Sequence, residues 1–193
     1  MTTTTGIYSG MRMTPEEFRG LPETGPRSEL IEGLLYIMPE PGLDHQFLVQ
    51  LLWKYLFDQL TLIGLAHTYI PVNVVLIEND YLSPDIIVVR SDRSGILGQV
   101  WVQGAPDIVV EVLSTDRDRD LVDKRRLYEV AGVPEYWLLD GDADNLIQLA
   151  LDDNGVYQER AVLAAADTLT TPLFPSLSLP LEQLFNHPAR IRA

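Results

Sequence analysis

Residues 107–113, which read Asp-Ile-Val-Val-Glu-Val-Leu, constrain the fold more than any other segment of the chain. A strand of this composition is apolar on both faces apart from its acids, which is typical of a central strand covered by other layers on two sides. Helical spacing over 120–131, ended by Gly132, and a second apolar strand over 135–139 follow directly. We therefore expect an α/β or α+β protein with a mixed β-sheet flanked by helices.

The rest of the chain predicts a series of short elements without an internal repeat or a linker. Thr14-Pro-Glu-Glu17 has the N-cap, the first-turn proline and the glutamate of a capping box, and predicts a short helix. The other expected elements are strands over 28–32 and 34–38 around Gly33, a long helix over 44–60 with Asp44 as N-cap, strands over 69–77 and 85–89, a hairpin over 146–161 and a short helix near Leu181. We expect a single domain over 1–193, with a loose leader at 1–13 and a tail at 186–193.

Composition limits the chemistry that the chain can perform. The 193 residues carry 14 Lys and Arg against 28 Asp and Glu, a net charge of −14, and 46% of them are hydrophobic, as in ordinary globular proteins. The chain has no cysteine, which excludes disulfides, thiol nucleophiles and cysteine-ligated metal sites. The N-terminus lacks the pattern of a signal peptide, and no apolar run approaches the ~20 residues that span a bilayer. We therefore expect a cytoplasmic protein without a membrane partner, whose acidity disfavours unassisted binding to nucleic acid.

Acidic residues at the strands are the first candidates for a functional site. Asp85 and Asp107 each follow a proline at a strand start, and Glu111 lies within the central strand. Asp107 and Glu111 share a strand face but are about 13 Å apart along it, which is too far for one ion to bridge. Asp85 can approach Glu111 laterally, because neighbouring strands lie ~4.8 Å apart. We expect Asp85 and Glu111 to pair; the alternative is that Glu111 is a structural acid bound to an arginine.

Lys124 is the candidate for a cation at this site. It shares one stripe of the predicted helix with Leu121, Tyr128 and Ala131, and this stripe should face the sheet. The lysine therefore points inward toward the strand ends, unless its side chain extends to solvent, as lysines readily do.

Spacing alone assigns no role to three further polar residues. His45 lies on the apolar stripe of the long helix, where a core histidine fits the pattern at least as well as a catalytic one. Glu29 and Glu32 lie on either side of Leu30 and Ile31 in the predicted strand over 28–32. Their spacing favours no particular chemistry.

A string of short motifs runs in order through most of the chain. It consists of Glu29-Leu-Ile-Glu-Gly33, His45, Ser83-Pro-Asp85, Gly104-Ala-Pro-Asp107, Glu111-Val-Leu-Ser114, Asp123-Lys-Arg125, Tyr128 and Gly132-Val-Pro-Glu-Tyr-Trp137. Together these motifs resemble the Uma family of bacterial endonucleases, and the resemblance covers about residues 14–185. It implies a restriction-endonuclease-like domain, of the superfamily named for its PD-(D/E)xK motif.

The resemblance also implies a divalent-metal site, with Mg²⁺ or Mn²⁺ as the cofactor. Asp85 and Glu111 would ligate the ion, the backbone carbonyl of Val112 would be a further ligand, and Glu29 would be an auxiliary acid. These residue types suit the chemistry, since magnesium prefers oxygen ligands and a water bound to it can attack a phosphodiester.

The sequence departs from the superfamily motif at one position. Leu113 stands two residues after Glu111, where the motif has its lysine. Lys124 looks like the migrated lysine of such families, and it replaces the missing cation if its ammonium reaches the site.

We expect a metal-dependent endonuclease that hydrolyses phosphodiester bonds in DNA, with Asp85, Glu111, Lys124 and Glu29 as its catalytic residues. A homodimer would suit cleavage of both strands of a duplex. The segment 117–126 has five basic residues against three acidic ones, and predicts a locally cationic rim beside the site. One alternative is an inactive nuclease-fold protein that serves as a binding or regulatory module. A metal-free hydrolase is less favoured, because a lysine beside the acids would keep them ionised.

Overall fold

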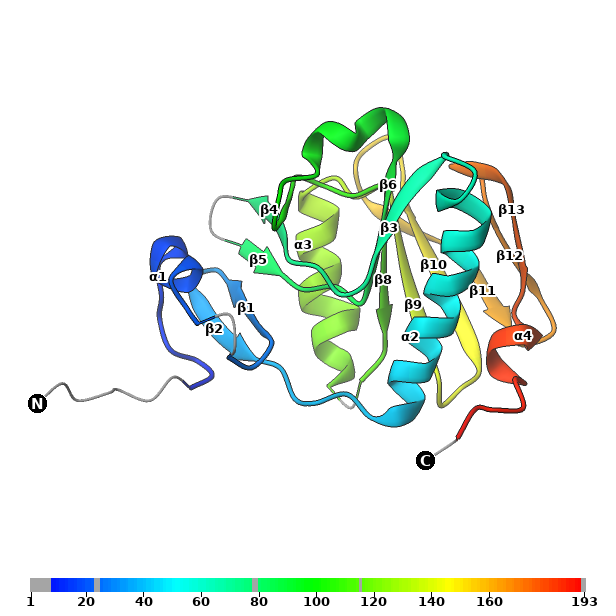
Figure 1. The fold of residues 1–193 in the computed structure, drawn as a ribbon, viewed down its shortest axis with the longest axis horizontal. Helices are drawn as coiled ribbons and strands as arrows, with labels where there is room; N and C mark the ends of the chain where they lie inside the picture. Colours follow the sequence, from blue (N-terminus) through cyan, green and yellow to red (C-terminus); the bar gives the residue numbers. More distant parts are fainter. Residues whose placement is uncertain (1–7, 23–24, 78–79, 115, 192–193) are drawn as a thin grey trace, which may run out of the picture.

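The computed structural model describes residues 8–22, 25–77, 80–114 and 116–191, and Figure 1 shows how its strands gather into sheets beside the helices. Its α-helices are α1 (Pro15–Arg19), α2 (Leu43–Leu56), α3 (Arg125–Val130) and α4 (Glu182–Phe185). A π-helical turn over Phe57–Thr61 continues α2, and a second π-helical turn over Arg119–Lys124 precedes α3. A 3₁₀ turn spans Ser91–Ile96. The strands are β1 (Ser28–Ile31), β2 (Leu34–Ile37), β3 (Ala66–Tyr69), β4 (Val74–Ile77), β5 (Asp80–Leu82), β6 (Ile86–Arg90), β7 (Val102–Gln103), β8 (Ile108–Val112), β9 (Glu135–Asp140), β10 (Asn145–Leu151), β11 (Tyr157–Ala164), β12 (Thr168–Thr171) and β13 (Phe174–Pro180). Within these ranges no helix is long and apolar enough to cross a membrane.

A six-stranded sheet, in the order β11-β10-β9-β8-β6-β3, forms the centre of the fold. β8 and β9 run parallel and the other neighbouring strands run antiparallel, so the sheet is mixed. Residues alternate along β8: Val110 packs in the core that contains α2, whereas Val109 packs with Leu127 and Tyr128 of α3 on the opposite face. The prediction of a central strand covered on both faces is therefore confirmed, and with it the mixed α/β fold class.

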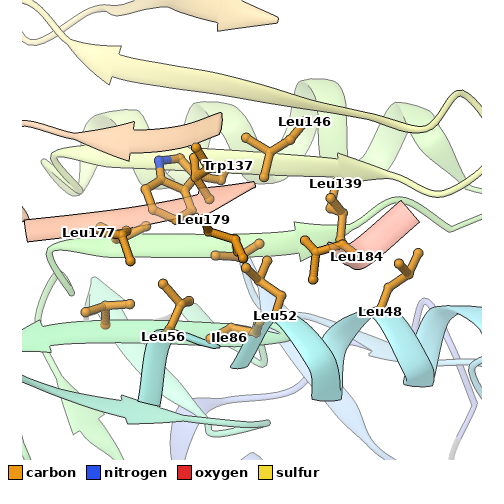
Figure 2. Packing of buried hydrophobic residues seen from close by; sticks show 14 of the residues in the cluster. Leu48, Leu52, Leu56, Ile86, Trp137, Leu139, Leu146, Leu177, Leu179 and Leu184 are labelled. Carbon is orange, nitrogen blue, oxygen red and sulfur yellow. The ribbon is translucent and has the colours of Figure 1, made fainter. Parts of the chain in front are cut away.

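The larger hydrophobic core lies between α2 and this sheet. Leu48, Leu52 and Leu56 are fully buried at a helical spacing of four, and they point toward Ile86 and Leu139 (Figure 2). The C-terminal strands β12 and β13 and helix α4 add further buried leucines to the same core. The apolar stripe that predicted the long helix is thus the face that packs on the sheet.

The N-terminal elements build a second mixed sheet, in the order β2-β1-β5-β4-β7. Glu32 and Gly33 join β1 to β2 with φ of 51° and 75°, and a two-residue hairpin turn of type I′ needs positive φ at both positions. The capping box that predicted α1 is present, because the Thr14 backbone N–H donates to the Glu17 carboxylate at 2.8 Å and the Glu17 N–H donates to the Thr14 hydroxyl at 3.2 Å. Both of these local predictions are confirmed.

The predicted strand over 69–77 is wrong, because two strands of different sheets occupy it. β3 ends at Tyr69 in the large sheet, and β4 begins at Val74 in the smaller one. Pro71 lies between them and has no N–H to donate to a strand ladder. The strands β5, β7, β12 and β13 were not predicted.

The described part of the predicted leader is not loose. Residues 8–13 run along β2, where the N–H of Gly10 donates to the Leu35 carbonyl at 2.7 Å and the N–H of Leu35 donates to the Met11 carbonyl at 2.8 Å. The N–H of Met13 donates to the Gly33 carbonyl at 2.9 Å. Residues 1–7 of that prediction lie outside the described residues.

The C-terminal tail is held by one arginine. The Arg190 side chain is only 2% exposed and forms ion pairs with Asp44 at 2.7 Å and with Asp144 at 2.6 Å. Asp44 is therefore not the N-cap that the sequence predicted, since Gly42 occupies that position without a side-chain cap and the carboxylate of Asp44 is bound to the tail.

Candidate active site

A cavity of about 650 Å³ lies where β6 begins and β8 ends. Four of the predicted site residues, Asp85, Glu111, Val112 and Lys124, line it. The remaining one, Glu29 of β1, is fully buried behind the cavity wall and forms an ion pair with Lys124. The fold thus brings together all of the predicted residues, from segments that lie far apart in the sequence.

Asp85 and Glu111 face each other across two antiparallel strands. The register pairs Ile86 with Val110, so one further step sets Asp85 opposite Glu111. Opposed residues of an antiparallel pair project from the same face of the sheet. The Oδ2 atom of Asp85 accepts a hydrogen bond from the Val112 N–H at 3.0 Å, which fixes the carboxylate at the strand end. The lateral approach inferred from strand spacing is therefore present.

The Lys124 side chain points into the fold and is 1% exposed, so the solvent-facing alternative is wrong. Its Nζ donates to Oε1 of Glu111 at 2.9 Å and lies 3.4 Å from Oδ1 of Asp120 and 3.5 Å from Oε1 of Glu29. The π-helical turn Arg119–Lys124 carries both Asp120 and Lys124, and such turns occur frequently at functional sites. Burial would lower the pKa of Lys124, but the surrounding carboxylates, Glu111 first, raise it instead. The ammonium is therefore held charged among the acids.

Glu29 is a buried acid that the neighbouring cations keep ionised. Its Oε1 accepts the backbone N–H of Ser83 at 2.9 Å, and its Oε2 accepts a short hydrogen bond from Arg119. Burial by itself would raise the pKa of Glu29, but Lys124, Arg119 and the Ser83 N–H outweigh it, so that the pKa is lowered. Glu29 therefore supplies a fixed negative charge behind Lys124.

The pKa of Glu111 is shifted in the opposite direction from that of Glu29. Burial, together with the nearby charges of Asp85, Asp120 and Glu29, raises the pKa of Glu111 to about 8 in spite of Lys124. Its Oε1 also accepts the Tyr128 hydroxyl at 2.9 Å, which fixes the position of the carboxyl group. Glu111 thus holds a proton near neutral pH unless another cation reaches it.

Asp85 is held by two residues from outside the sheet. Oδ1 accepts from Nη1 of Arg27 at 3.2 Å, and Oδ2 lies 3.2 Å from Nε2 of His45. Burial would raise the pKa of Asp85, but His45, followed by Arg27 and Lys124, lowers it to about 2. The Nδ1 atom of His45 is buried and has no hydrogen-bond partner among the described residues.

The donor set of the cavity fits a divalent cation that keeps several waters. Four carboxylates (Glu29, Asp85, Glu111, Asp120) gather around three cationic side chains (Arg27, Arg119, Lys124). When every acid is ionised, the acids outnumber the cations, and a bound divalent ion would relieve this excess. Among the described residues no group of three His, Asp or Glu side chains is arranged to hold a metal ion, so side chains would supply at most two of its ligands. Magnesium sites commonly combine one or two carboxylates with water.

The predicted cationic rim over 117–126 is wrong, because its charges do not form a free positive surface. Three of its arginines are bound to acids: Arg117 to Asp140, Arg119 to Glu29 and Arg126 to Glu32. Counting charges over a local segment overlooked these partners, because each of them comes from another part of the chain. The carboxylate of Glu32 forms this exposed pair with Arg126 and is not among the described residues that line the cavity. Asp107 also lies apart from the cavity and is bound to Arg93.

Sequence reasoning did not place Arg27, Arg119 and Asp120 at the site, and it left His45 undecided. Asp120 had a usable signal, because it lies four residues before Lys124 on one helical face. The two arginines had none, since Arg27 bonds a carboxylate 58 positions away and Arg119 one that is 90 positions away.

Comparisons with known proteins place the chain in a family and give it a solved structure of similar fold. The model of the Uma2 family, described as "Putative restriction endonuclease", matches residues 15–182. The chain is also similar to a solved structure described as "a putative nuclease belonging to DUF820 from Anabaena variabilis ATCC 29413". The two chains are 26% identical, and the match covers 90% of this chain and 98% of the other with a TM-score of 0.74. None of the curated proteins matches the chain.

Proposed function

The chain belongs to the Uma2 family, and from this premise we propose that it is a divalent-metal-dependent endonuclease that hydrolyses phosphodiester bonds in DNA. The family match and the nuclease-like fold support a nuclease. The metal dependence, the DNA substrate and the residue roles are our proposal.

One observation supports the proposal more than any other. The Lys124 ammonium lies 2.9 Å from Glu111, on the strand end where Asp85 stands opposite Glu111. Two facing carboxylates with a buried lysine are the groups needed to hold a hard cation and to orient a water beside it. Lys124 comes from the helix rather than from the strand of Glu111, so it compensates for Leu113 at the position of the usual lysine.

Asp85, Glu111 and the carbonyl of Val112 would hold Mg²⁺ or Mn²⁺, which lowers the pKa of a bound water and polarises the phosphate. Glu111 would lose its proton when the ion binds. Lys124 would orient the attacking water and offset the charge that develops on the phosphate oxygens. Glu29 would hold the ammonium of Lys124 in place.

Neighbouring side chains fix the positions of the two carboxyl groups that would ligate the ion, those of Asp85 and Glu111. His45 and Arg27 keep Asp85 ionised and fix its orientation, and Tyr128 fixes Glu111. Preorganised groups of this kind need little rearrangement in the transition state. A homodimer would let two such sites cut both strands of a duplex, and a DNA substrate would place the activity in the cytoplasm.

Cleavage of plasmid and oligonucleotide DNA with Mg²⁺ or Mn²⁺ tests the proposal. We expect Asp85→Asn and Glu111→Gln to lower the rate at least ~100-fold, because each removes a charge that would face the ion. Asp92→Asn and Glu32→Gln are matched controls, since they neutralise exposed acids of arginine pairs outside the cavity, and they should cleave like the wild type. Chelation should abolish the activity, and full cleavage by both cavity variants would refute the assignment.

A catalytically inactive binding or regulatory module is the second candidate. The observation in its favour is the net charge of −14 together with the acid-bound arginines beside the cavity. Calorimetric titration with Mg²⁺ and Mn²⁺ separates the two, because an endonuclease should bind the ion through Asp85 and an inert scaffold should not.

A further inference from the structure

A second cavity, of about 790 Å³, lies between residues 18–22 and 25–28 near the N-terminus and the turn that precedes β7. We call α1 and the β1–β2 hairpin the N-terminal unit; they lie at one end of the molecule beside β5 (Figure 1). Arg27 lines both this cavity and the one that contains Asp85, so the two cavities share a wall. A nucleic-acid strand bound in the first cavity would therefore have the second cavity directly beside it.

The described residues that line this cavity include two arginines, Arg19 and Arg27. Among the described residues none of its lining side chains is acidic, although the chain has 28 acidic residues. Arg19 lines it and is exposed. Its guanidinium donates to the Tyr81 hydroxyl at 3.0 Å and forms no ion pair within the described ranges. An arginine without an acidic partner suits a phosphate, which it can bind through two parallel hydrogen bonds.

An aromatic wall with fixed geometry borders the same cavity. The Trp101 ring packs edge-on against Tyr81 at 5.1 Å, and Tyr81 packs against Phe18 at 5.2 Å. The turn that carries Trp101 is tight, because the Gly98 N–H donates to the Trp101 carbonyl at 3.0 Å and a Cβ at position 98 would lie 2.6 Å from that oxygen. Tyr81 and Phe18 are buried, so Trp101, which is partly exposed, is backed by a rigid cluster.

Three amide side chains complete the lining: Asn73, Gln99 and Gln103. In the part of the chain that the structure describes, none of these side-chain amides forms a hydrogen bond. Each amide offers a donor and an acceptor side by side, which is the pattern that Asn and Gln use to bind base edges. Stacking on an aromatic ring then supplies affinity for any base.

We propose that this cavity binds a nucleotide of the substrate strand that flanks the phosphate cleaved at Asp85 and Glu111. The base lies against Trp101 with its edge on the amides, and its phosphate lies on Arg19. The inference rests on the proposed function, because the cavity is assigned to a strand that continues past Arg27 into the active site. It makes the N-terminal unit and the turn before β7 the part of the molecule that positions the substrate.

Fluorescence anisotropy of a labelled single-stranded 12-mer DNA, measured in EDTA at low salt, tests the inference without cleavage. We expect Arg19→Gln and Trp101→Leu each to raise the Kd about tenfold, since one stacked base or one phosphate contact is worth about that factor. Arg12→Gln is the matched control, because Arg12 is an exposed arginine next to β2 that forms no ion pair in the described ranges and does not line the cavity. Gln99→Ala, at an exposed position, gives a second test if Trp101→Leu fails to fold.

The outcomes separate this inference from the proposed function. Loss of binding in the Arg19 and Trp101 variants, with an unchanged Arg12 variant, supports the inference even if no metal produces cleavage. Cleavage that depends on Asp85, combined with wild-type Kd and KM in the Arg19, Trp101 and Gln99 variants, overturns the inference and leaves the nuclease assignment intact. Equal weakening by the Arg12 variant would also overturn it, because it would show that charge alone drives binding.

Discussion

Replacing Lys124 with methionine removes the charge at the centre of the site and keeps nearly the same volume. The ammonium lies within 3.5 Å of Glu29, Glu111 and Asp120, and its side chain is 1% exposed. Removing one partner of a buried ion pair leaves an uncompensated charge, which costs about 3–5 kcal/mol. We expect Lys124→Met to lower the free energy of unfolding by about that amount at pH 7.5, a large share of the 5–15 kcal/mol that is typical of a domain.

The loss should grow as the pH rises. Lys124 is the strongest of the cations that lower the pKa of Glu29. A lowered acid pKa gives its full stabilisation of the folded state above the ordinary value of 4.5, and this stabilisation is lost as the pH falls through the lowered pKa. At pH 4 part of this contribution is already lost in the wild type, so the two proteins should differ less there than at pH 7.5. Above pH 8 the carboxyl of Glu111 ionises in the wild type, whereas without the ammonium its pKa is higher still, so the difference widens again.

Urea unfolding at pH 4, 7.5 and 9 in EDTA measures this dependence. Lys54→Met is the matched control, because Lys54 is the other lysine of the chain and forms an exposed pair with Asp58. It should change stability little at any of the three pH values. A Lys124 variant as stable as the wild type, or equally destabilised at all three pH values, would refute the assignment of Lys124 as the buried counter-ion.

Three further predictions concern the metal site, a turn and the core. Mg²⁺ affinity measured by calorimetry should rise roughly tenfold per pH unit below 8, because Glu111 with a pKa of about 8 must release its proton; a flat profile would exclude Glu111 as a ligand. Gly33→Ala should cost about 1–2 kcal/mol in denaturant unfolding, since φ is 75° there, and an unchanged midpoint would contradict the turn geometry. Leu52→Ala should cost about 2–5 kcal/mol in the same assay, whereas Leu62→Ala, at a 67% exposed position, should cost far less.

The sequence predicts the centre of the fold because the signals there are local. The apolar run at 108–112 and the helical spacing that follows it are complete within a few residues. The small spacing between neighbouring strands allows Asp85 to approach Glu111. The inward direction of Lys124 follows from its stripe on the helix. The strand and the direction of Lys124 each need only the period of one element, whereas the pairing of Asp85 with Glu111 also needs β6 and β8 to be neighbours.

The rest depends on contacts between distant segments. Nothing near Arg119 in the sequence indicates that it will bind Glu29, and the predicted cationic rim failed for that reason. The strand over 69–77 failed because β-propensity does not report which sheet a segment joins. Both errors concern tertiary pairing, which overrides local preference.

The anchored tail has a practical consequence for anyone who works with this protein. Arg190 lines the first cavity beside Asp44, and its guanidinium also donates to the Gly141 carbonyl at 2.6 Å. Asp44 directly precedes His45, so the last turn of the chain braces the start of the helix that holds Asp85 in place. Removing residues 187–191 would therefore take away this brace and alter the wall of the first cavity.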